Sequence, residues 1–102
     1  MARTIKSNSR VRILISFDGI HEPELITMTA GQWNGTAIAM YECYISLHQK
    51  GTDAIAEPYR KAANRITAIL AMKGYFPKED CKEILDETKA LSPQLYEELT
   101  AK

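Results

Sequence analysis

The sequence has few cysteines and no long apolar run, and these absences exclude several classes of protein. It contains two cysteines, Cys43 and Cys81, whereas a small secreted domain held by disulfides carries about four to eight. No stretch approaches the roughly 18 consecutive apolar residues of a transmembrane helix. The apolar stretch 11–17 is too short and too interrupted for a signal peptide. We therefore expect a cytoplasmic protein with no membrane partner.

Net charge is also absent, because 13 Lys and Arg residues balance 13 Asp and Glu residues. A protein that binds nucleic acid mainly through phosphates is usually strongly basic, so this balance argues against that class. The charges are nevertheless segregated: segments 1–12 and 58–75 contain bases without acids, and segments 13–57 and 76–101 are mainly acidic. Such blocks are usually solvated faces, and they can also form complementary patches, either within a protein or toward a partner.

Motifs for metal, phosphate or nucleophilic chemistry are missing. The soft metal ligands are His21, His48, Cys43 and Cys81, and no HxxxH, CxxC or Glu-x-x-His spacing joins them. The five glycines form neither a P-loop nor a GxGxxG motif. The acids of segment 18–24 occupy an expected loop, whereas a metal nuclease holds its acids on rigid elements. We predict no catalytic residue, no metal and no cofactor.

What the sequence does contain is an ordered series of secondary-structure patterns. Residues 1–9 have no periodicity and predict a mobile basic arm. Residues 10–17 and 24–29 alternate apolar and polar side chains, which predicts two antiparallel strands. The pair Asp18-Gly19 is typical of a turn after the first strand.

Helical spacing of apolar residues follows, with segment 30–35 as an expected joint. Gly31 and Gly35 lie in that joint. Gly51 follows the expected helix 36–50, and glycine is favoured just after the end of a helix. Pro58 predicts a break or kink, because proline lacks the N–H that a helix interior requires. The expected helices are 36–50, 58–73, 77–90 and 93–101.

Helix 36–50 is the expected centre of the domain. Its apolar residues cover about half of its circumference, which is wider than the stripe of a surface helix. We therefore predict a single α+β domain over residues 10–102, with an N-terminal antiparallel β-hairpin followed by three to four helices packed as a small bundle. The hairpin would cover one side of helix 36–50, and helices 58–73 and 77–90 the other. A strand with a free apolar edge tends to pair, so we also expect a homodimer through the N-terminal strand.

Two groups of basic and polar residues are candidate contacts with a macromolecular partner. They are Arg10 and Arg12 on the first strand, and Arg60, Lys61, Asn64 and Arg65 on helix 58–73. The leading hypothesis is a small non-catalytic binding protein that regulates or inhibits a protein partner through such a charged surface. The acidic segment 79–87 is the alternative contact surface, and an inhibitor from a phage or mobile element would fit this description.

Two other hypotheses stay open. Backbone amides at a helix start near Trp33, Asn34 and Gly35 can bind an anion, and His48 can contact a ligand or change charge with pH. These residues would suit an oligomer that sequesters a small anionic ligand such as a nucleotide. The competing structural interpretation is that Trp33 covers the edge of the core and His48 bonds a carbonyl there. Finally, Arg10 and Arg12 on a β-ribbon are compatible with a DNA-binding regulator.

Overall fold

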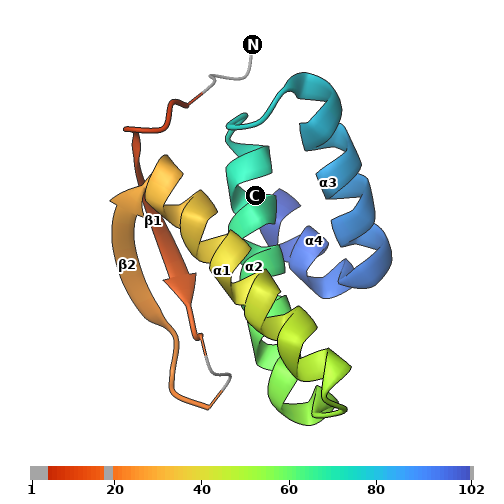
Figure 1. Cartoon of the computed structure of the whole chain (residues 1–102). Coiled ribbons are helices and arrows are strands. Elements are labelled where there is room, and N and C mark those ends of the chain that lie inside the picture. The colour runs from red at the N-terminus through yellow and green to blue at the C-terminus, as the bar shows by residue number, and fades with distance from the viewer. Residues whose placement is uncertain (1–4, 18–19, 102) are drawn as a thin grey trace.

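The computed structural model of the chain describes residues 5–17 and 20–101. The predicted fold class is confirmed: a two-stranded antiparallel hairpin precedes four helices (Figure 1). The elements are β1 (Arg10–Ile15), β2 (Glu24–Thr29), α1 (Ala30–Gln49), α2 (Asp53–Met72), α3 (Lys78–Leu91) and α4 (Pro93–Thr100). The predicted Asp18-Gly19 turn lies outside the described residues.

The hairpin has the alternation that its sequence predicts. β1 pairs with β2 so that Arg10 lies opposite Thr29 and Ile15 lies opposite Glu24. Val11, Ile13 and Ile15 are buried against the helices, while the residues between them are exposed. Both strands end close to their predicted bounds, because a sheet with one buried face requires a period of two.

Helix α1 begins at Ala30, so the prediction of a joint over 30–35 and a helix start at residue 36 was wrong. Thr29 caps the helix: the Gln32 N–H donates to Thr29 Oγ1 at 3.1 Å, and the Thr29 N–H donates to Gln32 Oε1 at 3.0 Å. This reciprocal capping box satisfies two donors that a helix start leaves unpaired. The cap and the burial of Ala30, Trp33 and Ala37 together offset the cost of Gly31 and Gly35 inside the helix, which is roughly 1 kcal/mol each relative to alanine.

Helix α2 runs without interruption from Asp53 to Met72, so the helix does not break at Pro58 and the predicted helix start at residue 58 was wrong. Proline removes one N–H from the intrahelical ladder. In this helix the loss is compensated by packing, since α2 contacts α1, α3, α4 and β1. Both long helices then end on a glycine with positive φ, 77° at Gly51 and 74° at Gly74, as the sequence predicts for residues just after a helix.

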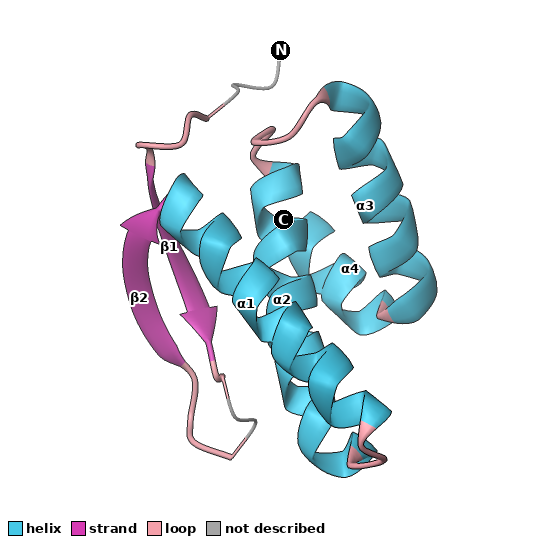
Figure 2. Ribbon diagram, viewed as in Figure 1, coloured by secondary structure: helices cyan, strands magenta, loops and turns pink. Residues whose placement is uncertain are grey.

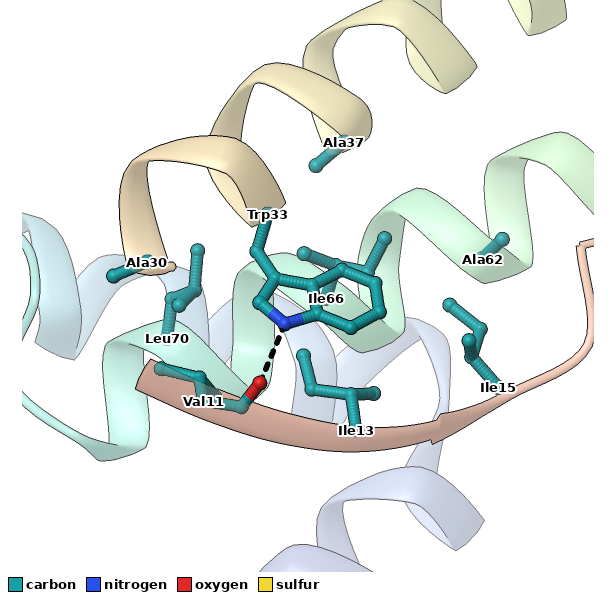
Figure 3. Packing of buried hydrophobic residues seen from close by; sticks show 9 residues of the cluster. All are labelled: Val11, Ile13, Ile15, Ala30, Trp33, Ala37, Ala62, Ile66 and Leu70. Atoms are coloured by element: carbon teal, nitrogen blue, oxygen red, sulfur yellow. Dashed lines mark hydrogen bonds between the residues drawn. The ribbon is translucent and has the colours of Figure 1, made fainter. Parts of the chain in front are cut away.

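Trp33 occupies the middle of the core rather than its edge. Its side chain is fully buried between β1 and α2, where Ile13 and Ile66 pack beside it (Figure 3). Its indole Nε1–H donates to the Val11 carbonyl at 2.8 Å. A buried indole therefore has a partner for its only polar atom, and it joins the hairpin to α1.

The central helix of the domain is α2 and not the helix over 36–50. Among the described helices and strands, α2 contacts every other helix and β1, whereas α1 contacts only α2 and the two strands of the hairpin. Helix α3 packs on α2 and α4 and leaves α1 untouched (Figure 2). The expected arrangement, with 58–73 and 77–90 both covering 36–50, is therefore corrected: α2 separates α1 from α3.

The described part of the expected mobile arm, residues 5–9, is bonded to the start of α1. The carbonyls of Ser7 and Ser9 accept hydrogen bonds from the Gly31 and Ala30 N–H groups at 2.9 and 2.8 Å. A Cβ at Gly31 would lie 3.3 Å from the Ser7 oxygen, so this close approach favours glycine. Residues 5–9 thus belong to the folded domain.

Candidate functional site: a groove between α1 and α3

An open groove of about 710 Å³ lies between α1 and α3, and α2 forms its floor. Side chains of both α1 and α3 line this space. The walls include Ile38, Tyr41 and Tyr44 of α1 and Ile84 and Leu91 of α3, and the floor includes Arg60, Asn64 and Thr67. The groove is thus walled by apolar side chains and has polar groups on its floor.

An exposed apolar stripe on α1 is the main feature of the groove. Ile38, Tyr41 and Ile45 are 53%, 51% and 42% exposed, and their spacing of three and four residues aligns them along one side of the helix. Ile38 and Tyr41 line the groove, and Ile45 extends the stripe beyond it. Leu91, which is 64% exposed, faces them from α3. Clustered exposure of large apolar residues marks a binding surface more often than isolated exposure does.

The apolar residues of this helix cover about half of its circumference because they include both a buried face and the exposed stripe. The buried residues of α1 are Ala30, Trp33 and Ala37, which meet the hairpin and α2. The next part of the arc has no covering element, because α3 packs on α2 instead. The predicted cover by residues 77–90 is missing, and the stripe stays about half exposed.

The positive charge on the floor of the groove is neutralised internally. Arg60 donates from Nε to Glu57 Oε1 at 3.0 Å and from Nη2 to Glu57 Oε2 at 2.8 Å. This hydrogen-bonded pair lowers the pKa of the Glu57 carboxyl and raises the pKa of the Arg60 guanidinium, because each partner stabilises the charged form of the other. The floor therefore carries a bound ion pair rather than a free cation.

The rim of the groove on α3 is acidic. Glu87 lines the groove, Asp80 lies on the same helix face as Ile84 and Glu87, and Glu83 lies one turn before Glu87. The lysines of α3 follow a different face: Lys78, Lys82 and Lys89 are spaced by four and seven residues. Lys89 Nζ lies 5.5 Å from the centroid of the Tyr96 ring on α4, which places this face away from the groove.

A second depression, of about 720 Å³, lies between α2 and α4 and contains most of the predicted basic residues of 58–73. Arg65 crosses it: its Nε donates to the Leu14 carbonyl at 2.6 Å and its Nη2 to Glu98 Oε1 at 2.8 Å. The hydrogen bonds from Arg65 lower the pKa of the Glu98 carboxyl. Arg65 therefore links β1, α2 and α4, while Lys61 on the same helix is exposed.

The structure does not gather the predicted partner-binding residues on one surface. Arg10 and Arg12 are exposed on the outward face of the hairpin, while β1 turns its other face to α2. Lys61 and Arg65 line the depression beside α4, Asn64 lines the groove between α1 and α3, and Arg60 lines both. Their role in binding stays a prediction, and the basic surface is divided among three places.

The predicted ligand-binding residues are also separated. Trp33 is buried, Asn34 lines the groove, and Gly35 is exposed. His48 lies about 22 Å from Trp33 along the helix axis, at a rise of 1.5 Å per residue. None of these residues is at a helix start, so the argument from free backbone amides no longer applies.

His48 is exposed, and its partner is a carboxylate rather than a core carbonyl. Its Nδ1 lies 2.6 Å from Asp53 Oδ1, and its ring stacks on Tyr44 with centroids 5.6 Å apart. These contacts connect the end of α1 to the start of α2. His48 therefore has a structural role in the joint between the two long helices.

Sequence reasoning missed Ile38, Tyr41, Ile45 and Leu91 as candidate site residues. The sequence did contain a signal for them: the apolar residues of 36–50 cover more of the helix circumference than the neighbours of an ordinary surface helix bury. That arc was assigned entirely to the core. Which part of an arc the core covers depends on where other helices lie, and residue spacing does not contain that information.

Other chemistry finds little support in the parts of the chain that the structure describes. No cluster of three or more His, Cys, Asp or Glu residues forms a potential metal site there. Within the same residues, no helix is both long and apolar enough to cross a bilayer. Both cysteines are free thiols; Cys43 is exposed, and Cys81 donates to the Phe76 carbonyl at 3.2 Å. Comparison of the chain with protein-family models, curated proteins and solved structures found no match.

Proposed function

We propose that this chain is a non-catalytic protein-binding module that holds an amphipathic helix of its partner in the groove between α1 and α3. The observation that carries the proposal is the exposed stripe Ile38, Tyr41 and Ile45, which faces Leu91 across a groove floored by α2. An amphipathic helix that lays its apolar face into such a groove is a recurring mode of peptide recognition.

The dimensions of the groove suit a helix of two to three turns. The α1 residues that line it run from Asn34 to Tyr44, a length of about 15 Å at a rise of 1.5 Å per residue. A helix seated between α1 and α3 would pack at the usual interaxial distance of about 8–10 Å. It would bury apolar side chains that the folded chain leaves in water, and this burial is the driving force for binding.

The charges around the groove indicate that the bound helix is basic. Glu87 lines it on the α3 side, and helical spacing places Asp80 and Glu83 close to the same face of α3. Among the described residues that line the groove, the one cation is Arg60, which is already paired with Glu57. Lysine or arginine residues that flank the apolar stripe of a partner helix would meet this rim. Charge complementarity of this kind accelerates association and excludes acidic competitors.

This proposal moves the predicted contact surface from the basic residues to the apolar groove with its acidic rim. Arg60 and Arg65 both hold carboxylates of their own chain, so an acidic partner would have to replace bonds that already exist. Sequestering a regulatory helix would regulate or inhibit the partner, as the charge segregation first suggested. The exposed free thiol of Cys43 is compatible with a reducing compartment such as the cytoplasm.

Binding of designed helical peptides tests the proposal directly. We would compare two labelled peptides with the same leucine stripe, one flanked by lysines and one by glutamates, by fluorescence anisotropy. The lysine-flanked peptide is expected to bind more tightly, and its affinity should fall with added salt because the rim charges are screened. Failure of both peptides to bind would contradict the proposal.

Matched variants locate the binding surface. Ile38→Asp is expected to weaken binding by about tenfold or more, because it places a charge inside an apolar contact. Ile55→Asp is the control, since Ile55 is 61% exposed but lines neither depression. Reversing the rim with Glu83→Lys and Glu87→Lys should shift the preference toward the glutamate-flanked peptide. Equal losses for Ile38→Asp and Ile55→Asp would show that the contact lies elsewhere.

A further inference from the structure

The outer edge of the hairpin is formed by β2. Strand β1 is held against the helices, because its Val11 and Leu14 carbonyls accept hydrogen bonds from Trp33 and Arg65. Helix α2 packs on β1, whereas β2 contacts only β1 and α1 among the described elements. Figure 2 shows β2 at the margin of the domain, with β1 between it and the helices. The expected pairing strand is thereby changed from β1 to β2.

The one charge of this edge lies at its end, because Glu24 is the first residue of β2 and Pro23 precedes it, so residues 25–29 carry no charge. β2 contains neither lysine nor proline, and its six residues pair with β1 in an unbroken register. Next to the edge, Leu14 and Leu25 form a cross-strand pair whose side chains are each about half exposed. Protected edges normally have a charge, a proline or a bulge. A straight edge beside exposed leucines is instead suited to receive another strand.

We propose that β2 pairs antiparallel with β2 of a second copy of this chain, which extends the two hairpins into one four-stranded sheet. The sequence of the strand selects the register. Side chains that lie directly opposite each other must be on the same face of a sheet. In a symmetric pair of β2 strands, one residue must therefore lie opposite its own copy, and the two-fold axis passes between these two copies. The candidate central residues are Ile26 and Thr27.

Thr27 is the better centre. With the axis at Thr27, Ile26 lies beside the partner's Met28, so two half-buried apolar side chains meet on the helix side of the sheet. With the axis at Ile26, Glu24 would lie beside the partner's Met28, which would bring a carboxylate to that apolar side. The register centred on Thr27 therefore matches apolar with apolar on the face that the helices cover.

The charges of two copies do not oppose this assembly. The chain has a formal net charge of zero, so long-range repulsion between copies is small. In the proposed register Arg12 pairs with Thr27, and Thr27 with its own copy. The two Arg12 residues are then three strand spacings apart, about 14 Å. This separation exceeds the Debye length of about 8 Å at physiological salt, so their repulsion is largely screened.

Charge-pair variants at the axis test the dimer. Thr27 is exposed on the outward face, so Thr27→Lys and Thr27→Glu are expected to fold, which circular dichroism and thermal unfolding would check. Light scattering should show that the wild-type chain reaches the mass of a dimer as concentration rises. Each variant alone should stay monomeric over the same range, and an equal mixture of the two should recover the dimer. Gln49→Lys, at the exposed end of α1, is the control that should dimerise as the wild type does.

A cross-linking experiment reads the register independently. In a Cys43→Ser background, Thr27→Cys should form an intermolecular disulfide under mild oxidation, because it lies opposite itself across the axis. Leu25→Cys should not, since it lies opposite the partner's Thr29. A wild-type chain that stays monomeric at the highest concentration, or a dimer that persists in both Thr27 charge variants, would overturn the proposal. The groove between α1 and α3 contains no hairpin residue, so this result is independent of peptide binding.

Discussion

The two long helices have equal lengths and opposite roles. Helices α1 and α2 each contain 20 residues, yet α2 has seven buried residues and α1 has three. Most of the buried residues of α2 are alanines, whose small side chains let neighbouring elements approach on several sides. The larger apolar residues of α1, such as Ile38 and Tyr41, remain half exposed. Helix α2 therefore organises the core, and α1 presents a surface.

This contrast separates two properties of a helix: how much of its circumference is apolar, and how many other elements pack against it. A wide apolar arc such as that of α1 indicates how much surface favours burial, but a partner molecule can supply part of the cover. A helix rich in alanine shows a weaker apolar pattern even when it is buried on several sides. Small residues allow close approach, and close approach on several sides is what makes a helix central.

Truncating one isoleucine in each helix gives the largest expected difference. Ile66→Ala in α2 removes a fully buried side chain and should lower the free energy of unfolding by about 2–5 kcal/mol. Ile38→Ala in α1 removes a side chain that is already half in water, and its cost should stay below about 1 kcal/mol. Urea unfolding measures both. Similar losses would mean that the stripe on α1 contributes to the core.

Adding carbon atoms should have opposite effects on the two helices. Gly35 of α1 has no atom within 4 Å of an added Cβ, so Gly35→Ala should stabilise the fold by about 0.5–1 kcal/mol. Ala68 of α2 is fully buried, so Ala68→Val should destabilise it by about 1–3 kcal/mol through overpacking. Thermal unfolding of the two variants would show the sign. A stabilising Ala68→Val would reveal unfilled space around α2.

The smallest expected effect concerns the ion pair that ties α2 to α4. Arg65 lowers the pKa of Glu98 in the folded chain from its ordinary value of 4.5. The pair therefore stabilises the fold above that pH, and this contribution is lost as the pH falls through the lowered pKa. The Glu98 side chain is 57% exposed, so Glu98→Gln should cost less than about 1 kcal/mol at neutral pH.

Unfolding curves at several pH values test this pH dependence. The difference in stability between the wild type and Glu98→Gln should be present at neutral pH and should disappear at acid pH, where the wild-type carboxyl is protonated. Glu97→Gln is the matched control, because it makes the same charge change one residue away on the same helix. A difference that persists unchanged at low pH would show that Glu98 stabilises the fold by packing and not by its charge.

Much of the fold was predictable because its signals are local. The alternation of β1 identified Val11, Ile13 and Ile15 as its buried face, and Gly51 marked the end of α1. The start of α1 was missed although its signal was also local: Thr29 and Gln32 have the spacing of a capping box. Gly31 and Gly35 carry the opposite signal, and the cap together with the burial of Trp33 offsets it.

The candidate site was less predictable, because its residues are exposed only where no other helix packs over them. Arg60 and Arg65 have basic side chains in any conformation, and only the fold shows that each is paired with a carboxylate of the same chain. Leu91 and Ile38 are typical core residues by type, and they become surface residues because α3 packs on α2 and not on α1. No spacing rule distinguishes these outcomes.

The amino-acid sequence by itself determined the order of the elements, the buried face of β1 and the glycines that end the long helices, since each depends on side-chain periodicity or backbone conformation over a few residues. Only the tertiary structure decided that α2 is the centre, that the Trp33 side chain is buried between β1 and α2, and that the apolar stripe of α1 stays exposed. The reason is that these properties depend on contacts between distant residues. Arg65, for example, bonds Leu14 and Glu98, which are 51 and 33 positions away.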